Sequence, residues 1–124
     1  MAKVFSVHQD ITLHEGASAE EFERFVTEEA YPAFSTLQGW TPYLLRGIKG
    51  NRSGQYLWLV EIESIEAFTR FVLLEGTHTE EAEQFLASNA AVFERWQTFA
   101  SGPFVPIFTD YLAVGREDED AKAI

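Results

Sequence analysis

The chain has 124 residues, 46% of them apolar and 15% aromatic, which is enough for one domain with its own core and too little for two ordinary domains. Nine basic and twenty acidic residues give a net charge of −11, which repels phosphate backbones and anionic lipids, so neither nucleic acid nor a membrane is an expected partner. The chain has no cysteine, no run of ~20 apolar residues and no signal-like N-terminus, which excludes disulfides and thiolate metal sites and favours a cytoplasmic location.

The first predicted element is a strand over residues 4–13, because apolar and polar residues alternate there as they do in a strand that buries one face. The apolar set includes Phe5, Val7 and Ile11, and the polar set includes His8 and Asp10. We expect the apolar set to pack against the helices. The polar set should then point to the opposite side of the sheet.

A helix is predicted next. Ser18 and Glu21 have the spacing of a capping box, and apolar residues recur after them at three- and four-residue steps as far as Leu37. Pro32 lies inside this helix. Proline lacks an N–H group and disfavours helical geometry at the residue before it, here Tyr31, so we expect a kink or a break.

Two β-rich stretches follow, over residues 40–47 and 55–63. The turn-forming residues 49–54 between them predict a hairpin with an irregular loop. Ser64 then predicts the start of a short helix, because serine is a favoured N-cap residue.

A longer helix completes the helical part of the chain. Thr77 and Glu80 have the spacing of a second capping box, and Gly102 with the proline after it predicts the end of this helix. The last strand is predicted over residues 108–114. Residues 116–124 have the composition of an acidic, solvated tail.

The predicted order of elements indicates an α+β fold. Without the extra helix before the last strand, the order is β-α-β-β-α-β, in which two right-handed crossovers place the helices on one face of a four-stranded antiparallel sheet. This is the ferredoxin-like arrangement. Residues 1–115 are therefore predicted to form a single domain, and one face of its sheet is left without helices.

The third predicted strand indicates what covers that second face. Its wholly apolar parity, which contains Trp58, should face the helices, so Leu57, Leu59 and Glu61 should lie on the other side. Such a mixture is too apolar for a sheet face in water. We therefore expect the chain to form a homodimer through this face.

Four segments of the sequence resemble the dimeric α+β barrel superfamily: residues 18–25 (SAEEFERF), 31–34 (YPAF), 50–57 (GNRSGQYL) and 60–64 (VEIES). The resemblance implies that two sheets pack face to face into a shared barrel. Proteins of this superfamily include antibiotic-biosynthesis monooxygenases, haem-degrading enzymes, EthD-like and NIPSNAP-like proteins, so the resemblance concerns the fold rather than one activity.

His8 and Arg46 are the candidate catalytic residues. Asp10 follows His8 by two strand positions and would orient its ring, which makes His8 a candidate general base. Arg46 would stabilise an enolate-like charge, and Glu61 would join both residues on the barrel side. The structural alternative is a polar pair at the dimer seam together with an ion pair between Arg46 and Glu61.

The aromatic residues offer a second kind of site. Tyr43 and Trp58 could enclose a flat apolar ligand, or they could be ordinary core residues. His78 would be the ligand for haem in a haem-degrading protein, but the first strand has no asparagine beside the pocket as those enzymes have. We therefore expect no cofactor, and no histidine spacing indicates a metal site.

Three functions remain open at this point. The first is a homodimeric protein that binds a small apolar or aromatic molecule without chemistry of its own. The second is a cofactor-independent monooxygenase, or an isomerase or cyclase, that acts on an aromatic or polyketide-like substrate. The third is a structural or interaction protein without a ligand. A pocket of about 300 Å³ or more in which His8 or Arg46 meets aromatic side chains would support the first two.

Overall fold

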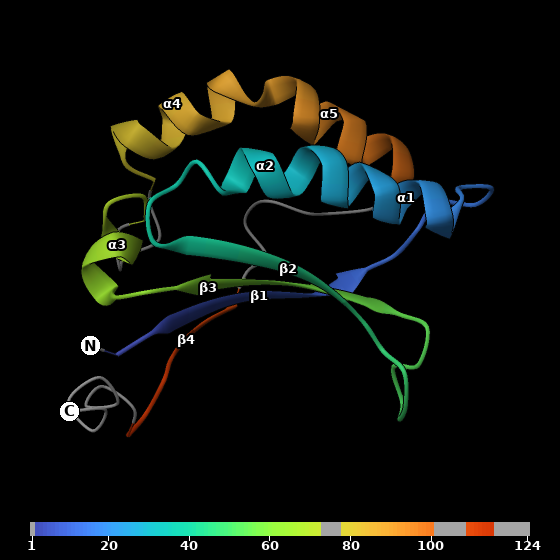
Figure 1. Ribbon diagram of the computed structural model, residues 1–124, viewed down its shortest axis with the longest axis horizontal. Coiled ribbons are helices and arrows are strands. Elements are labelled where there is room, and N and C mark those ends of the chain that lie inside the picture. The colour runs from blue at the N-terminus through green and yellow to red at the C-terminus, as the bar shows by residue number, and fades with distance from the viewer. Residues whose placement is uncertain (1, 73–77, 101–108, 116–124) are drawn as a thin grey trace.

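The computed structural model describes residues 2–72, 78–100 and 109–115, and Figure 1 shows the arrangement of its elements. In chain order these are β1 (Val4–Ile11), α1 (Ala19–Phe25), the π-helix η1 (Val26–Ala30), α2 (Tyr31–Phe34), β2 (Trp40–Arg46), β3 (Tyr56–Ile62), α3 (Ile65–Thr69), α4 (Glu80–Ser88), α5 (Ala90–Phe99) and β4 (Thr109–Leu112).

The four strands form one antiparallel sheet in the order β2-β3-β1-β4. The two central strands, β1 and β3, are each followed by a helical connection, and this order is that of a ferredoxin-like fold. Helices α1, α2, α4 and α5 all lie on one side of the sheet (Figure 1). The predicted α+β fold class is thus confirmed.

The core lies between the sheet and the helices and is rich in aromatic side chains. Trp58 of β3, Trp96 of α5 and Phe22 of α1 are fully buried. The ring of Trp96 lies 5.1 Å from that of Trp58 and 5.1 Å from that of Phe22, both edge to face. Edge-to-face contacts between large buried rings add to the stabilisation from burial itself, so these rings join α1 and α5 to the sheet.

The first helix begins as predicted and continues differently. The Ser18 hydroxyl accepts a hydrogen bond from the Glu21 amide at 3.2 Å. Of the kink or break expected at Pro32, the break does not occur, because Tyr31 keeps helical angles (φ −59°, ψ −49°). The turn before it is instead a π-turn, in which the Tyr31 amide bonds to the Val26 carbonyl. This wider turn shifts the hydrogen-bond ladder ahead of the proline, and the helix continues through it.

The long helix predicted near the C-terminus is two helices, α4 and α5. Asn89 separates them with non-helical angles, and its side-chain amide donates to the Phe85 carbonyl at 3.0 Å. The N-cap of α4 is Thr79, whose hydroxyl accepts from the Ala82 amide at 3.3 Å. The predicted cap, Thr77, lies outside the described residues.

The outer edge of β2 offers few free amide donors to a further strand. Three of the alternate positions that face this edge have no free N–H group. The Trp40 amide donates to the Leu37 carbonyl at 3.1 Å, Pro42 has no N–H group, and the Leu44 amide donates to the Tyr31 hydroxyl at 2.8 Å. A strand that approached from this side would find no donors at these positions.

A β-bulge in β1 changes the faces predicted for its side chains. Val4, Ser6 and His8 pair with Ile62, Val60 and Trp58, and the register then shifts so that Ile11 pairs with Tyr56. Three residues of β1 therefore span two of β3, and Ile11 shares the helix-facing side with His8. The predicted assignment of Phe5 and Val7 to the helix-facing side is wrong, because both pair with residues of the opposite side.

The opposite side, here called the outer face, has mostly apolar and aromatic side chains. Its apolar residues are Phe5 and Val7 of β1, Tyr43 and Leu45 of β2, Leu57 and Leu59 of β3, and Tyr111 of β4. Tyr43, Leu45 and Tyr111 are 40%, 45% and 49% exposed. The prediction for β3 is confirmed, since Trp58 is buried under the helices while Leu57 and Leu59 lie on the outer face.

Candidate functional site

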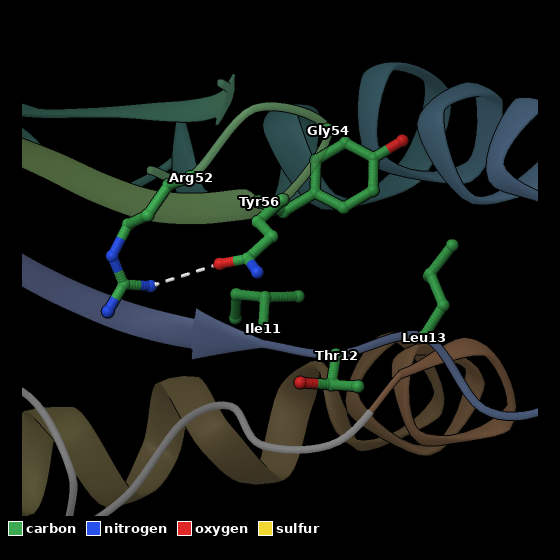
Figure 2. A pocket seen from close by; sticks show the side chains of 7 residues that line it. Ile11, Thr12, Leu13, Arg52, Gly54 and Tyr56 are labelled. Atoms are coloured by element: carbon green, nitrogen blue, oxygen red, sulfur yellow. Dashed lines mark hydrogen bonds between the residues drawn. The ribbon is translucent and has the colours of Figure 1, made fainter. Parts of the chain in front are cut away.

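A pocket of about 450 Å³ lies at the end of the sheet where β1 ends and the β2–β3 hairpin begins. Its lining residues come from two segments that are far apart in the sequence: Ile11, Thr12 and Leu13 after β1, and Arg52, Gly54, Gln55 and Tyr56 from the hairpin. Figure 2 shows these side chains around the space between them. The β-bulge places Ile11 directly across from Tyr56, so the apolar floor of the pocket depends on the bulge.

The pocket has an apolar floor and a polar rim. Ile11 and Tyr56 are buried, and Leu13 is half-buried. Thr12, Arg52, Gly54 and Gln55 form the rim and are exposed. The Arg52 guanidinium donates to the side-chain oxygen of Gln55 at 3.5 Å (Figure 2). This composition suits a small molecule with an apolar body and a polar group.

Backbone hydrogen bonds hold the hairpin loop that carries the rim. The Gly47 amide donates to the Gln55 carbonyl at 2.9 Å, and the Gly54 amide donates to the Gly47 carbonyl at 2.7 Å. The Gln55 amide donates to the Arg52 carbonyl at 3.0 Å. A Cβ atom at Gly47 would lie 2.0 Å from that same carbonyl oxygen, so only glycine allows this close approach.

Tyr56 connects the pocket floor to the first helix. Its ring lines the pocket, and its hydroxyl donates to the Glu23 carboxylate of α1. The same carboxylate oxygen accepts a hydrogen bond from the Arg46 guanidinium at 2.9 Å. The Glu23 carboxylate thereby fixes side chains from β2 and β3 against α1, behind the pocket.

This environment keeps the Tyr56 hydroxyl protonated. Burial, together with the hydrogen bond to the negative Glu23 carboxylate, raises the pKa of Tyr56 to about 12. The nearby Arg46 charge opposes this shift only in part. At neutral pH Tyr56 is therefore a hydrogen-bond donor that positions the pocket floor, rather than a base or a nucleophile.

His8 lies on a different side of the sheet from the one predicted. It is 2% exposed and sits on the helix-facing side, opposite Trp58. The prediction that it points into the space beyond the uncovered face is wrong, because the alternating pattern reverses at the bulge. His8 does not line the pocket at the end of the sheet.

The predicted convergence of His8, Arg46 and Glu61 is also wrong. Arg46 lies on the helix-facing side and pairs with Glu23, whereas Glu61 lies on the outer face and pairs with Lys3 at 2.5 Å. An ion pair between Arg46 and Glu61 is excluded for the same reason. Lys3 and Glu61 therefore pair on the outer face, and Arg46 pairs with Glu23 of α1 on the helix-facing side.

The other predicted ligand-binding residues are likewise divided. Trp58 is a fully buried core residue, and Tyr43 lies on the outer face. Asp10 lies in β1, and its side chain is outside what the structure describes. His78 precedes α4 in an isolated bridge with Val72. Among the described residues, no group of three or more histidine and acidic side chains has the arrangement of a metal site.

Sequence reasoning missed the pocket itself. Its floor depends on the bulge that brings Ile11 opposite Tyr56, and an alternating hydrophobic pattern carries no sign of an extra residue in one strand. Arg52 is predicted only as part of a turn-forming loop. The sequence feature that could have indicated the pocket is the cation at position 52, just before the chain enters β3.

Within the described part of the chain, no helix has the length and apolar character to span a membrane.

Comparison with solved structures finds a likeness to a Dabb family protein with a ferredoxin-like fold from Mesorhizobium loti MAFF303099. That protein is 22% identical, with a TM-score of 0.49, over 92% of this chain and 97% of that chain. No protein-family model matches the sequence, and a search of curated proteins gave no match. The ferredoxin-like description of the present chain follows from its own strand order.

Proposed function

We propose that this protein is a homodimer that binds a small apolar or aromatic molecule in the pocket at the end of each sheet. The observation that carries the proposal is the pocket itself. It has about 450 Å³ of space, a floor of Ile11, Leu13 and Tyr56, and a rim with hydrogen-bonding groups. Small-molecule sites in proteins have this size and this mixture of surfaces.

The outer face supports the homodimer. Seven apolar or aromatic side chains occupy it, and helices α1, α2, α4 and α5 lie on the other side of the sheet (Figure 1). The ion pair between Lys3 and Glu61 lies at one end of this face, and the remaining outer-face side chains of the two central strands are apolar. A second copy that turns the same face toward the first would remove these side chains from water, which is the main source of stability in such interfaces.

The proposed function is ligand binding without catalysis. The enzymatic alternatives need His8 as a base close to Arg46, and neither side chain lines the pocket. Arg46 is instead engaged with the Glu23 carboxylate. Tyr56, the titratable group of the floor, stays protonated at neutral pH.

Sedimentation analysis tests the assembly. The wild-type protein should sediment as a dimer at micromolar concentration. Leu59→Lys should dissociate it, because an unpaired ammonium in a desolvated interface costs on the order of several kcal/mol. Gln84→Lys is the matched control, since it adds the same charge to an exposed position of α4. A monomeric wild type, or a dimer unaffected by Leu59→Lys, would refute the proposed interface.

Native mass spectrometry of protein from its source cells tests the pocket. A retained small molecule should add a defined mass to each protomer. Thr12→Trp should abolish this mass, because the exposed Thr12 side chain lines the rim and an indole there would fill the pocket. A retained molecule that survives Thr12→Trp would place the ligand elsewhere and contradict this assignment.

A further inference from the structure

Gln55 is held at three points on the rim of the pocket. Its backbone carbonyl accepts a hydrogen bond from the Gly47 amide at 2.9 Å, and its backbone amide donates to the Arg52 carbonyl at 3.0 Å. Its side-chain oxygen accepts from the Arg52 guanidinium at 3.5 Å. The backbone and one end of the side chain are therefore fixed before any ligand arrives, so less conformational freedom is lost on binding.

The bond to Arg52 determines which end of the Gln55 carboxamide can contact a ligand. A guanidinium has only N–H donors, so it binds the carboxamide through its oxygen and leaves the NH2 group turned away. Figure 2 shows this bond as a dashed line at the pocket. Within the described part of the chain, the NH2 group donates to no protein acceptor. Because Gln55 lines the pocket, its NH2 group is a hydrogen-bond donor for a ligand there.

Two further donors of the pocket lining are already used within the protein. The Gly54 amide donates to the Gly47 carbonyl at 2.7 Å, and the Tyr56 hydroxyl donates to the Glu23 carboxylate. The ligand group that matches the Gln55 donor is a hydrogen-bond acceptor. The net charge of −11 disfavours an anion in this place, so a neutral acceptor such as a carbonyl oxygen fits best.

We propose that the ligand of this pocket is a neutral carbonyl compound, whose apolar body of one or two rings lies on Ile11, Leu13 and Tyr56 and whose carbonyl oxygen accepts a hydrogen bond from the Gln55 side-chain amide. This inference rests on the proposed function and adds the polar group of the ligand to it. Gln55 then distinguishes a ketone, aldehyde or ester from a hydrocarbon of the same shape.

Two fluorescent probes that differ in one group test the inference. 6-Propionyl-2-(dimethylamino)naphthalene is the ketone, and 2-(dimethylamino)-6-propylnaphthalene has a methylene in place of the carbonyl. The propyl probe gains more from burial alone, so the informative quantity is the ratio of the two dissociation constants in each protein. Gln55→Leu should weaken binding of the ketone about fivefold, the usual worth of one neutral hydrogen bond, and should change binding of the propyl probe less than about twofold.

Two further variants complete the test. Gln55→Glu can still bind Arg52 but has no N–H donor, so it should weaken the ketone at least as much as Gln55→Leu does. Gln84→Leu makes the same change at an exposed position of α4 outside the pocket and should leave the ratio as it is in the wild type. All variants are checked for unchanged sedimentation and thermal unfolding, and Gln55→Glu answers the question if Gln55→Leu folds poorly.

The outcomes separate this inference from the proposed function. If both probes bind, Thr12→Trp abolishes both, and the Gln55 variants leave the ratio unchanged, the pocket binds small molecules and the carbonyl assignment is refuted. If neither probe binds, or if binding does not depend on Thr12, the pocket is not the binding site and the proposed function falls with the inference. Selective loss of the ketone in both Gln55 variants supports both.

Discussion

Tyr56 performs two tasks with the two ends of one side chain. Its ring forms part of the pocket floor, and its hydroxyl holds the Glu23 carboxylate of α1. Glu23 in turn holds Arg46 of β2. Deprotonation of this hydroxyl would therefore change both the packing of α1 on the sheet and the shape of the pocket.

The raised pKa of Tyr56 predicts a loss of stability at alkaline pH. In the unfolded chain the phenol titrates near 10, whereas in the folded protein its pKa is about 12. Between these values the unfolded state has lost a proton that the folded state still holds, so the free energy of unfolding falls as the pH rises from 10 to 12.

Urea unfolding at pH values from 9 to 12 measures this dependence. Tyr56→Phe should be less stable than the wild type at pH 9 and should lose stability less steeply above pH 10. An identical slope in both proteins would show that other tyrosines and lysines account for the alkaline dependence. The comparison is needed because those groups also titrate in this range.

The side of the sheet on which His8 lies could not be predicted from the sequence. The alternation of apolar and polar side chains in the first strand is real, and it correctly separates Phe5 and Val7 from His8. The pattern cannot say which set faces the helices, because a bulge reverses the relation between Ile11 and the residues before it. The buried positions next to His8 are therefore occupied by the polar Ser6 as well as by Val4 and Ile11.

Among the elements, strand β3 was the most predictable. Tyr56, Trp58, Val60 and Ile62 alternate strictly with less buried residues. Because β3 is a central strand with one face under the helices, this alternation identifies the side chains that face the helices. The helix over residues 80–99 was predicted less well. Its apolar stripe continues through Asn89, so the stripe alone does not reveal that the backbone turns there.

Thr79 is the connection on which α4 depends. Its hydroxyl caps the Ala82 amide and donates to the Arg70 carbonyl at 2.6 Å, and its own amide donates to the Phe71 carbonyl at 3.0 Å. These bonds attach the start of α4 to the end of α3. The two helices are thereby joined independently of the residues between them in sequence.

Replacement of this cap should destabilise the protein measurably. Thr79→Ala should lower the free energy of unfolding by about 1–2 kcal/mol, because it removes both the cap and the bond to Arg70. Thr98→Ala is the control. Its hydroxyl donates to the Arg95 carbonyl at an exposed position of α5, so its loss should cost less than about 0.5 kcal/mol. Equal effects of the two substitutions in chemical denaturation would contradict the capping role of Thr79.

At the scale of the whole molecule, charge and apolar surface oppose each other. Each protomer carries a net charge of −11, and two protomers brought together must repel. Burial of the aromatic and aliphatic side chains of the outer face would favour association and oppose this repulsion. The fold could be predicted because the helices and the sheet follow from hydrophobic periodicity. The pocket could not, because it depends on a bulge and a loop conformation that leave no such periodic pattern.

This balance predicts that salt strengthens the proposed dimer. Raising the ionic strength from about 0.02 M to about 0.5 M shortens the Debye length several-fold and screens the repulsion between protomers, while apolar contacts persist. The dissociation constant from sedimentation should therefore fall as salt is added. A dissociation constant that rises instead would show that ion pairs, rather than apolar side chains, hold the interface.

The shortage of free amide donors on the outer edge of β2 bears on how this sheet could add further strands. In the language of polymer chemistry, a chain that grows by adding strands edge to edge must be a bifunctional monomer, with one reactive end for each neighbour. At Trp40, Pro42 and Leu44 one of those ends is blocked by an internal acceptor, a missing donor and the Tyr31 hydroxyl. These three positions offer no free amide donor to an added strand, so strand addition at the β2 edge is disfavoured along this stretch.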